Sequence, residues 1–192
     1  MFAFELEPFR EKRRRGRRGR LGAFGDVLVE AERRKPSVKA GSSHLEVRLS
    51  GTHMPEVFYR TTGPFQATMK NAVLTVDGAT VQLSFNDRAF RNSTRALRFS
   101  HMDRMYEYAV IGFGKGATLH RPGVGITLTR GKSAARRGTS TLGAATGDFD
   151  ALDLALALVF EEVDTAELTT VGAMSKTLDR ILNPGSNEPS AE

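Results

Sequence analysis

The residue types that most often carry chemistry are sparse in this 192-residue sequence. There is no cysteine, which excludes disulfides, thiolate metal sites and thiol nucleophiles. The histidines, at positions 44, 53, 101 and 120, lack the short spacings that bring two imidazoles to one metal ion. Ser100, His101 and Asp103 combine the residue types of a catalytic triad, but neighbours on a strand point to opposite faces. The sequence therefore predicts no catalytic residue and no metal site.

Two glycine-containing segments resemble nucleotide-binding loops without meeting their requirements. The Gly-Lys-Ser segment at 131–133 ends like a phosphate-binding loop, but that motif needs glycine where this chain has Ile126. The segment Gly112–Gly116 resembles a dinucleotide loop, but Ala117 stands where a further glycine is needed and no helix is expected to follow. We therefore expect no bound cofactor.

The strongest chemical feature is a basic run near the N-terminus. Residues 10–20 hold eight basic side chains and one acid, Glu11, so their local charge is +7 and the rest of the chain is close to neutral. Mutual repulsion of these charges predicts a mobile basic tail over residues 1–22. Each cation near an anionic leaflet contributes about 1 kcal/mol to binding. The candidate residues for contact with an anionic surface are Arg10, Lys12, Arg13, Arg14, Arg15, Arg17, Arg18 and Arg20.

Three phenylalanines beside this run, Phe2, Phe4 and Phe9, are candidates for an apolar anchor. An apolar group next to a polybasic segment supplies two signals for membrane association, although Glu5 and Glu7 oppose deep insertion. Two alternatives stay open. The tail could only keep the protein soluble, or it could bind nucleic acid together with a second series of basic and aromatic residues. That series consists of Arg88, Phe90, Arg91, Arg95, Arg98 and Phe99.

The elements that position these residues are predicted to be mainly strands from about residue 26 to 130. Leu45, Val47 and Leu49 alternate with polar residues, as on a half-buried strand. Asp77-Gly78, between the alternating runs 72–76 and 79–85, predicts a hairpin with a two-residue turn. Many short strands with Gly and Pro between them predict antiparallel pairing in a barrel or a sandwich. Further strands are expected at 27–32, 57–61, 95–101, 106–113, 117–120 and 124–129, followed by a turn-rich loop at 131–147.

The pattern changes after this loop, where residues 148–163 favour a helix. Ala and Leu dominate the segment, and Asp148, Asp150 and Asp153 lie where the positive end of the helix dipole favours acids. Residues 154–160 are apolar without interruption, so the helix must be buried on all sides and a curved sheet must surround it. A second, amphipathic helix is expected from Asp164, with Leu168, Val171, Leu178 and Leu182 near one face.

These expectations define the fold class as mainly β (α+β): an antiparallel barrel or sandwich enclosing or packed on a hydrophobic C-terminal helix, with an amphipathic helix after it. Residues 23–182 are predicted to form one β-rich domain, and the polar residues 183–192 a disordered tail. No segment approaches the roughly 20 apolar residues that span a bilayer. The N-terminus carries acids where a signal peptide needs an apolar run. We therefore expect a cytoplasmic protein that associates peripherally with membranes.

Two segments resemble the tubby C-terminal-like barrels, which include the phospholipid scramblases and the LURP-one-related proteins. They are Tyr106-Glu107-Tyr108-Ala109-Val110-Ile111 leading to Gly116, and the Asp-led, Ala/Leu-rich residues 150–159. In those families a closed barrel encloses a hydrophobic C-terminal helix, and the resemblance implies binding of lipid or protein. Pleckstrin-homology-like domains are an alternative. The resulting hypothesis is a non-enzymatic binding module that contacts anionic phospholipid; an RNA-binding protein and a protein–protein interaction scaffold are the alternatives.

Overall fold

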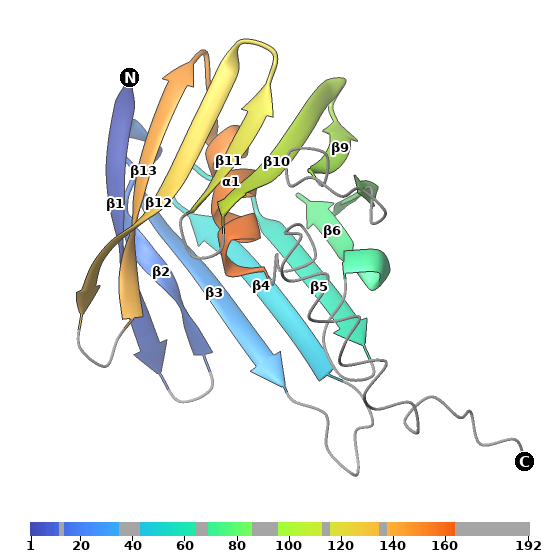
Figure 1. Cartoon of the computed structure of the whole chain (residues 1–192), viewed down its shortest axis with the longest axis horizontal. Coiled ribbons are helices and arrows are strands. Elements are labelled where there is room, and N and C mark those ends of the chain that lie inside the picture. The colour runs from blue at the N-terminus through green and yellow to red at the C-terminus, as the bar shows by residue number, and fades with distance from the viewer. Residues whose placement is uncertain are drawn as a thin grey trace, which may run out of the picture.

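The computed structural model describes residues 1–11, 14–34, 43–63, 69–85, 96–112, 116–134 and 138–163. Within these residues a single antiparallel sheet curves into a nearly closed barrel, and one helix lies inside the curve (Figure 1). The predicted fold class is thereby confirmed. The strands are β1 (Phe2–Glu11), β2 (Arg14–Arg20), β3 (Asp26–Arg34), β4 (Ser43–Gly51), β5 (Val57–Gly63), β6 (Val73–Val76), β7 (Ala79–Val81), β8 (Leu83–Phe85), β9 (Leu97–His101), β10 (Arg104–Gly112), β11 (Gly116–Arg121), β12 (Val124–Ala134) and β13 (Gly138–Gly147). The helix is α1 (Ala151–Glu162), and two short 3-10 turns are η1 (Gly22–Phe24) and η2 (Met69–Asn71).

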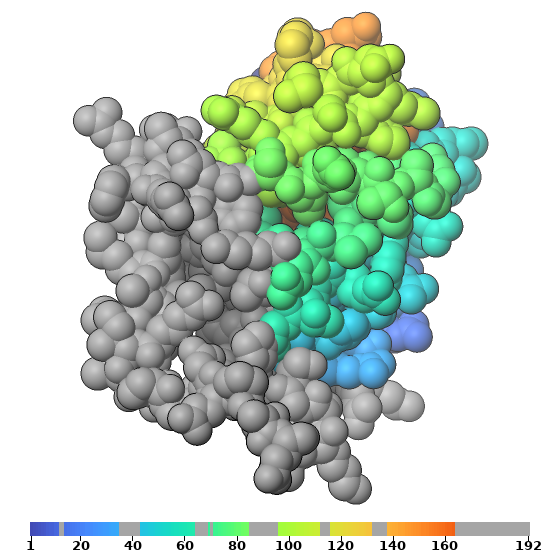
Figure 2. Space-filling view, turned by 90° about the vertical axis from the view of Figure 1, so that its right-hand side faces the viewer, coloured from blue at the N-terminus to red at the C-terminus, as the bar shows by residue number. Residues whose placement is uncertain are grey.

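The sheet consists of two runs of consecutive strands that meet where β1 pairs with β13. One run proceeds from β1 to β7 and the other from β13 back to β8, so β7 and β8 are the two edges of the sheet. Only Gln82 separates these edge strands along the chain. Figure 2 shows the side where the edges meet: the green atoms of β6 to β8 lie directly beside the yellow-green atoms of β9 and β10. We call this junction the seam of the barrel.

The alternating strands place their apolar residues on the concave face of the sheet. Leu45, Val47 and Leu49 of β4 are fully buried there, as their spacing predicts. At the Asp77-Gly78 turn both residues have positive φ, 46° and 81°, which confirms the hairpin between β6 and β7. The second arm of that hairpin is split, because β7 pairs with β6 whereas β8 pairs with β9.

Helix α1 fills the barrel. Asp150 caps its N-terminus by accepting a hydrogen bond from the backbone of Asp153, whose carboxylate accepts one from the backbone of Asp150 in return. Every residue from Leu154 to Phe160 is at most 1% exposed, which confirms that the segment is shielded around its full circumference. The helix ends at Glu162, and the second helix and the disordered tail predicted beyond Asp164 lie outside the described residues.

The prediction of a mobile tail over residues 1–22 is wrong. Residues 2–11 and 14–20 form β1 and β2, and they pair with β13, with each other and with β3. The repulsion within the basic run is relieved because β2 lies between two strands that carry acids, including Glu7 and Glu11 on one side and Glu30 on the other. The basic run is part of the barrel wall.

The prediction of a loop over residues 131–147 is also wrong. Strand β12 continues to Ala134, and residues 138–147 form β13. The sequence of β13 consists mainly of Gly, Ala, Ser and Thr, which resembles a loop. Its small residues are needed because large side chains fill the space in front of them; the ring of Phe4 occupies the place that a side chain at Gly143 would take.

Candidate functional site: the arginine rim of the barrel

The arginine side chains of strand β2 lie on both faces of the sheet. Arg15 and Arg17 stand opposite Ala31 and Val29, which are buried core residues of β3, so this register places both arginines on the concave face. Alternation places the other arginines of the strand, Arg14, Arg18 and Arg20, on the convex face. The charge of the basic run is therefore divided between two environments.

The convex arginines lie among acids. Arg18 is directly opposite Glu7, Arg20 is opposite Asp26, and Nη1 of Arg14 lies 3.4 Å from Oε1 of Glu30. The guanidinium of Arg18 also lies over the ring of Phe9, 5.9 Å from its centre.

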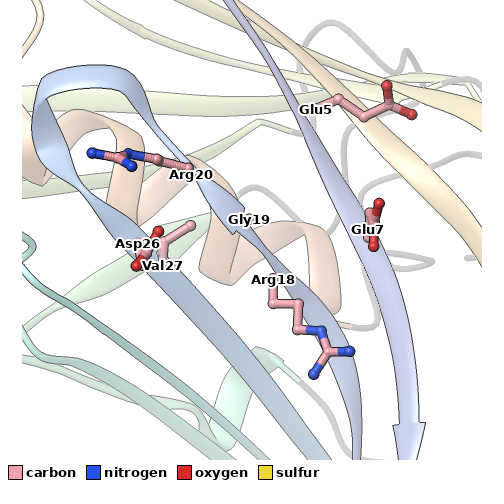
Figure 3. Close-up of a pocket in the computed structure, with 7 residues that line it drawn as sticks. All are labelled: Glu5, Glu7, Arg18, Gly19, Arg20, Asp26 and Val27. Carbon is pink, nitrogen blue, oxygen red and sulfur yellow. The ribbon is translucent and has the colours of Figure 1, made fainter.

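A shallow depression of about 510 Å³ on this face is lined by more acids than bases (Figure 3). Its charged residues are Glu5 and Glu7 of β1, Arg18 and Arg20 of β2, and Asp26 of β3. The +7 run therefore does not produce a basic convex surface.

Three further concave arginines lie on the strands beside the C-terminal end of α1. Arg10 of β1 is directly opposite Arg15 of β2, and Arg130 continues the concave series of Ile126 and Leu128 on β12. Arg10, Arg15 and Arg130 are exposed, and none of them forms a hydrogen bond or a salt bridge with a described residue. Like charges directly opposite one another on a sheet are destabilising. We call these three residues the arginine rim; within it, Arg10 and Arg15 form a like-charged pair that a bound anion would stabilise.

Beneath the rim, four residues form a partly buried polar cluster at the C-terminal end of α1. Arg17 Nε donates a 2.7 Å hydrogen bond to the hydroxyl of Thr141, which in turn donates to Oε1 of Glu161. Arg17 also forms salt bridges with both glutamates: its Nη2 lies 3.9 Å from Oε1 of Glu161, and its Nη1 lies 3.3 Å from Oε1 of Glu162. We call Arg17, Thr141, Glu161 and Glu162 the helix-end cluster.

The helix-end cluster is short of positive charge. Two carboxylates share one guanidinium, and both lie at the negative end of the helix dipole. Burial raises the pKa of Glu161, and the hydrogen bond from Thr141 and the charge of Arg17 only partly oppose this. Glu161 Oε2 and Glu162 Oε1 are buried without a hydrogen-bond partner among the described residues.

The opposite end of α1 is closed by paired charges. Arg121 donates two 2.8 Å hydrogen bonds to the fully buried carboxylate of Asp153, and the Tyr106 hydroxyl donates a third at 3.2 Å. Arg104 pairs with Asp150. Burial alone would raise the pKa of Asp150, but the hydrogen bonds from Arg104 and the Asp153 backbone hold it below its usual value. Asp150 and Asp153 are thus each matched to an arginine at this end of the helix.

The structure describes the predicted apolar anchors as buried or partly buried side chains of β1. Phe4 is 9% and Phe9 is 7% exposed, and the ring of Phe2 stacks on Phe149 at 5.5 Å. Of the predicted basic residues, Lys12 and Arg13 lie outside the described residues.

The second basic and aromatic series does not form the expected stacking platform where it is described. Arg98 is paired with Glu107 at 3.0 Å, and the ring of Phe99 is buried against Tyr106. The other members, at 88, 90, 91 and 95, lie outside the described residues.

Across the described chain no three His, Cys, Asp or Glu side chains are arranged to hold a metal ion. Likewise, no described helix is both long and apolar enough to cross a bilayer.

Sequence reasoning identified Arg10 and Arg15 but missed their neighbours at this end of the barrel. Arg130 could have been found, because it extends the alternation of Ile126 and Leu128 by one more inward position. Glu161 and Glu162 gave no comparable signal, because a helix end says nothing about which strand lies beside it. Comparisons with family models, curated proteins and solved structures find no match to this chain.

Proposed function

We propose that this protein is a non-enzymatic binding module that associates with an anionic phospholipid surface through its arginine rim. The observation that carries the proposal is that Arg10, Arg15 and Arg130 are exposed and form no hydrogen bond or salt bridge with a described residue. On the convex face of β2, by contrast, Arg14 pairs with Glu30, and Arg18 and Arg20 stand directly opposite Glu7 and Asp26.

The expected strength of the contact follows from its charge. Three cations near an acidic leaflet contribute about 3 kcal/mol in total, a roughly 100-fold gain in partitioning over a neutral vesicle. The gain requires the arginines to face the membrane together, which their position around one barrel end supports. Because the contact is electrostatic, salt should weaken it.

The other partners considered from the sequence are less well supported. A nucleic-acid phosphate could also pair with the rim, but Phe99 is unavailable for stacking on a base. The enclosed C-terminal helix is the feature that the tubby-like resemblance implies, and membership of that family remains a prediction. Placement in the cytoplasm at a membrane surface is part of this proposal.

The proposal is tested by sedimentation with vesicles of phosphatidylcholine containing increasing fractions of phosphatidylglycerol. We expect binding that rises with the acidic fraction and falls about 30-fold in the double variant Arg10→Gln, Arg15→Gln, because two of the three rim charges, worth about 2 kcal/mol, are removed. RNA added as a competitor distinguishes the nucleic-acid alternative, since it would displace the vesicles.

The matched control is the double variant Arg14→Gln, Arg18→Gln. It removes the same charge from the same strand pair, but from convex positions that face acids. We expect it to bind like the unaltered protein. Equal losses in the two variants would show that only net charge matters, and unchanged binding in the rim variant would refute the role of the rim.

A further inference from the structure

The helix-end cluster lies directly behind the arginine rim. Arg17 is two residues from Arg15 on the same face of β2, a separation of about 7 Å along the strand. Thr141, which bonds both Arg17 and Glu161, stands opposite Arg130 across the β12–β13 pair. A change of charge at Glu161 is therefore felt at the rim.

The groups around Glu161 come from several elements. Arg17 of β2 and Thr141 of β13 contact its carboxylate directly. Arg130 of β12 attracts it from a greater distance, and Glu162 of α1 repels it. Tyr108 of β10 is buried nearby, and burial together with Glu161 and Glu162 raises its pKa, so this phenol stays neutral. Protonation of Glu161 would therefore remove one of the two negative charges of the helix-end cluster.

We propose that protonation of Glu161 strengthens the hold of the arginine rim on an anionic surface, so that the protein binds more tightly as the pH falls. This inference rests on the proposed function and adds its regulation. While Glu161 is ionised, its charge offsets that of Arg17 and Arg130. Once it is protonated, this end of the barrel gains one positive charge without any change of fold.

The size of the effect can be bounded from Coulomb's law. One charge acting over about 10 Å through a partly aqueous medium changes affinity by roughly 3- to 10-fold. The direction of the effect follows from burial, which raises the pKa of Glu161. This carboxylate therefore takes up its proton at a higher pH than an exposed glutamate does, and phosphodiester lipids are still ionised at that pH.

The experiment measures vesicle affinity between about pH 8 and about pH 5 for the full chain and for Glu161→Gln, with phosphatidylglycerol as the acidic lipid. We expect the unaltered protein to gain affinity as the pH falls. Glu161→Gln should bind at high pH as tightly as the unaltered protein does at low pH, and it should lose this part of the pH dependence. Histidine titration is common to all variants and cancels in the comparison.

Two further variants keep the test decisive. Glu30→Gln removes a carboxylate that pairs with a convex arginine, and its pH profile should match that of the unaltered protein. Thr141→Val deletes the hydroxyl that favours ionised Glu161, so the rise in affinity should begin at higher pH. Equal pH slopes in the unaltered protein and Glu161→Gln would overturn the coupling alone. Absence of vesicle binding at every pH would overturn both proposals.

Discussion

At the scale of single residues, Asp153 joins helix α1 to strands β10 and β11. Its carboxylate is fully buried, and it accepts hydrogen bonds from Arg121, the Tyr106 hydroxyl and the backbone of Asp150. A buried charge of this kind is tolerated because all its neighbours donate to it. Removing the charge would leave Arg121 in a protected position without its counter-ion.

We therefore expect Asp153→Asn to lower the free energy of unfolding by about 3 kcal/mol, the usual loss when one partner of a buried pair is removed. Urea unfolding followed by circular dichroism measures the change. Asp148→Asn is the control, since Arg121 contacts only the backbone carbonyl of Asp148, and it should cost less than about 0.5 kcal/mol. If Asp153→Asn lowered the free energy of unfolding as little as the control does, apolar packing and not the buried ion pair would be what holds this end of the helix.

At the scale of elements, β13 is central to the sheet although its sequence predicts a loop. It pairs with β1 on one side and β12 on the other, so it joins the two runs of strands. A side chain at Gly143 would have its Cβ 2.0 Å from the ring of Phe4. Glycine here is required by a neighbour 139 positions away in the chain.

Gly143→Ala should accordingly destabilise the protein by about 1–3 kcal/mol, the cost of overpacking a core. Thermal unfolding measures it, with Ala144→Val on the convex face of the same strand as the control. If the collision with Phe4 is the cause, adding Phe4→Leu to Gly143→Ala should cost less than the two single changes together. Simple additivity would point to the backbone of β13 instead.

The elements differ in how far their own residues specify them. Strand β4 and helix α1 are predictable because alternation in one and unbroken apolar sequence in the other reflect burial directly. Strand β2 is not, because its stability depends on acids in β1 and β3 that meet it only after folding. The same applies to the candidate site: Arg10 and Arg15 stand out by composition, whereas their position at the mouth of the barrel depends on register.

At the scale of the whole molecule, enclosure of α1 makes a general prediction about opening. The helix contacts β3, β4, β5, β11 and β12, so water reaches its backbone only when strands separate. Hydrogen exchange of the amides from Leu154 to Phe160 should therefore be among the slowest in the protein and report global unfolding.

Mass spectrometry of deuterated peptides measures this, and the edge strand β7 is the internal comparison. Its amides lie at the seam and should exchange faster than those of the helix. Fast exchange throughout residues 154–160 would contradict the enclosed arrangement, and with it the placement of the helix-end cluster behind the rim.

The meeting of β1 and β13 also constrains how the barrel is made on the ribosome. Every other strand pair joins neighbours along the chain, so hairpins can form as each second arm emerges. Phe2, by contrast, pairs with Ala145, which is translated 143 residues later. Until then, one edge of β1 has backbone N–H and C=O groups without a strand partner. The nascent chain must avoid pairing this edge with strands of other chains, which would lead to aggregation.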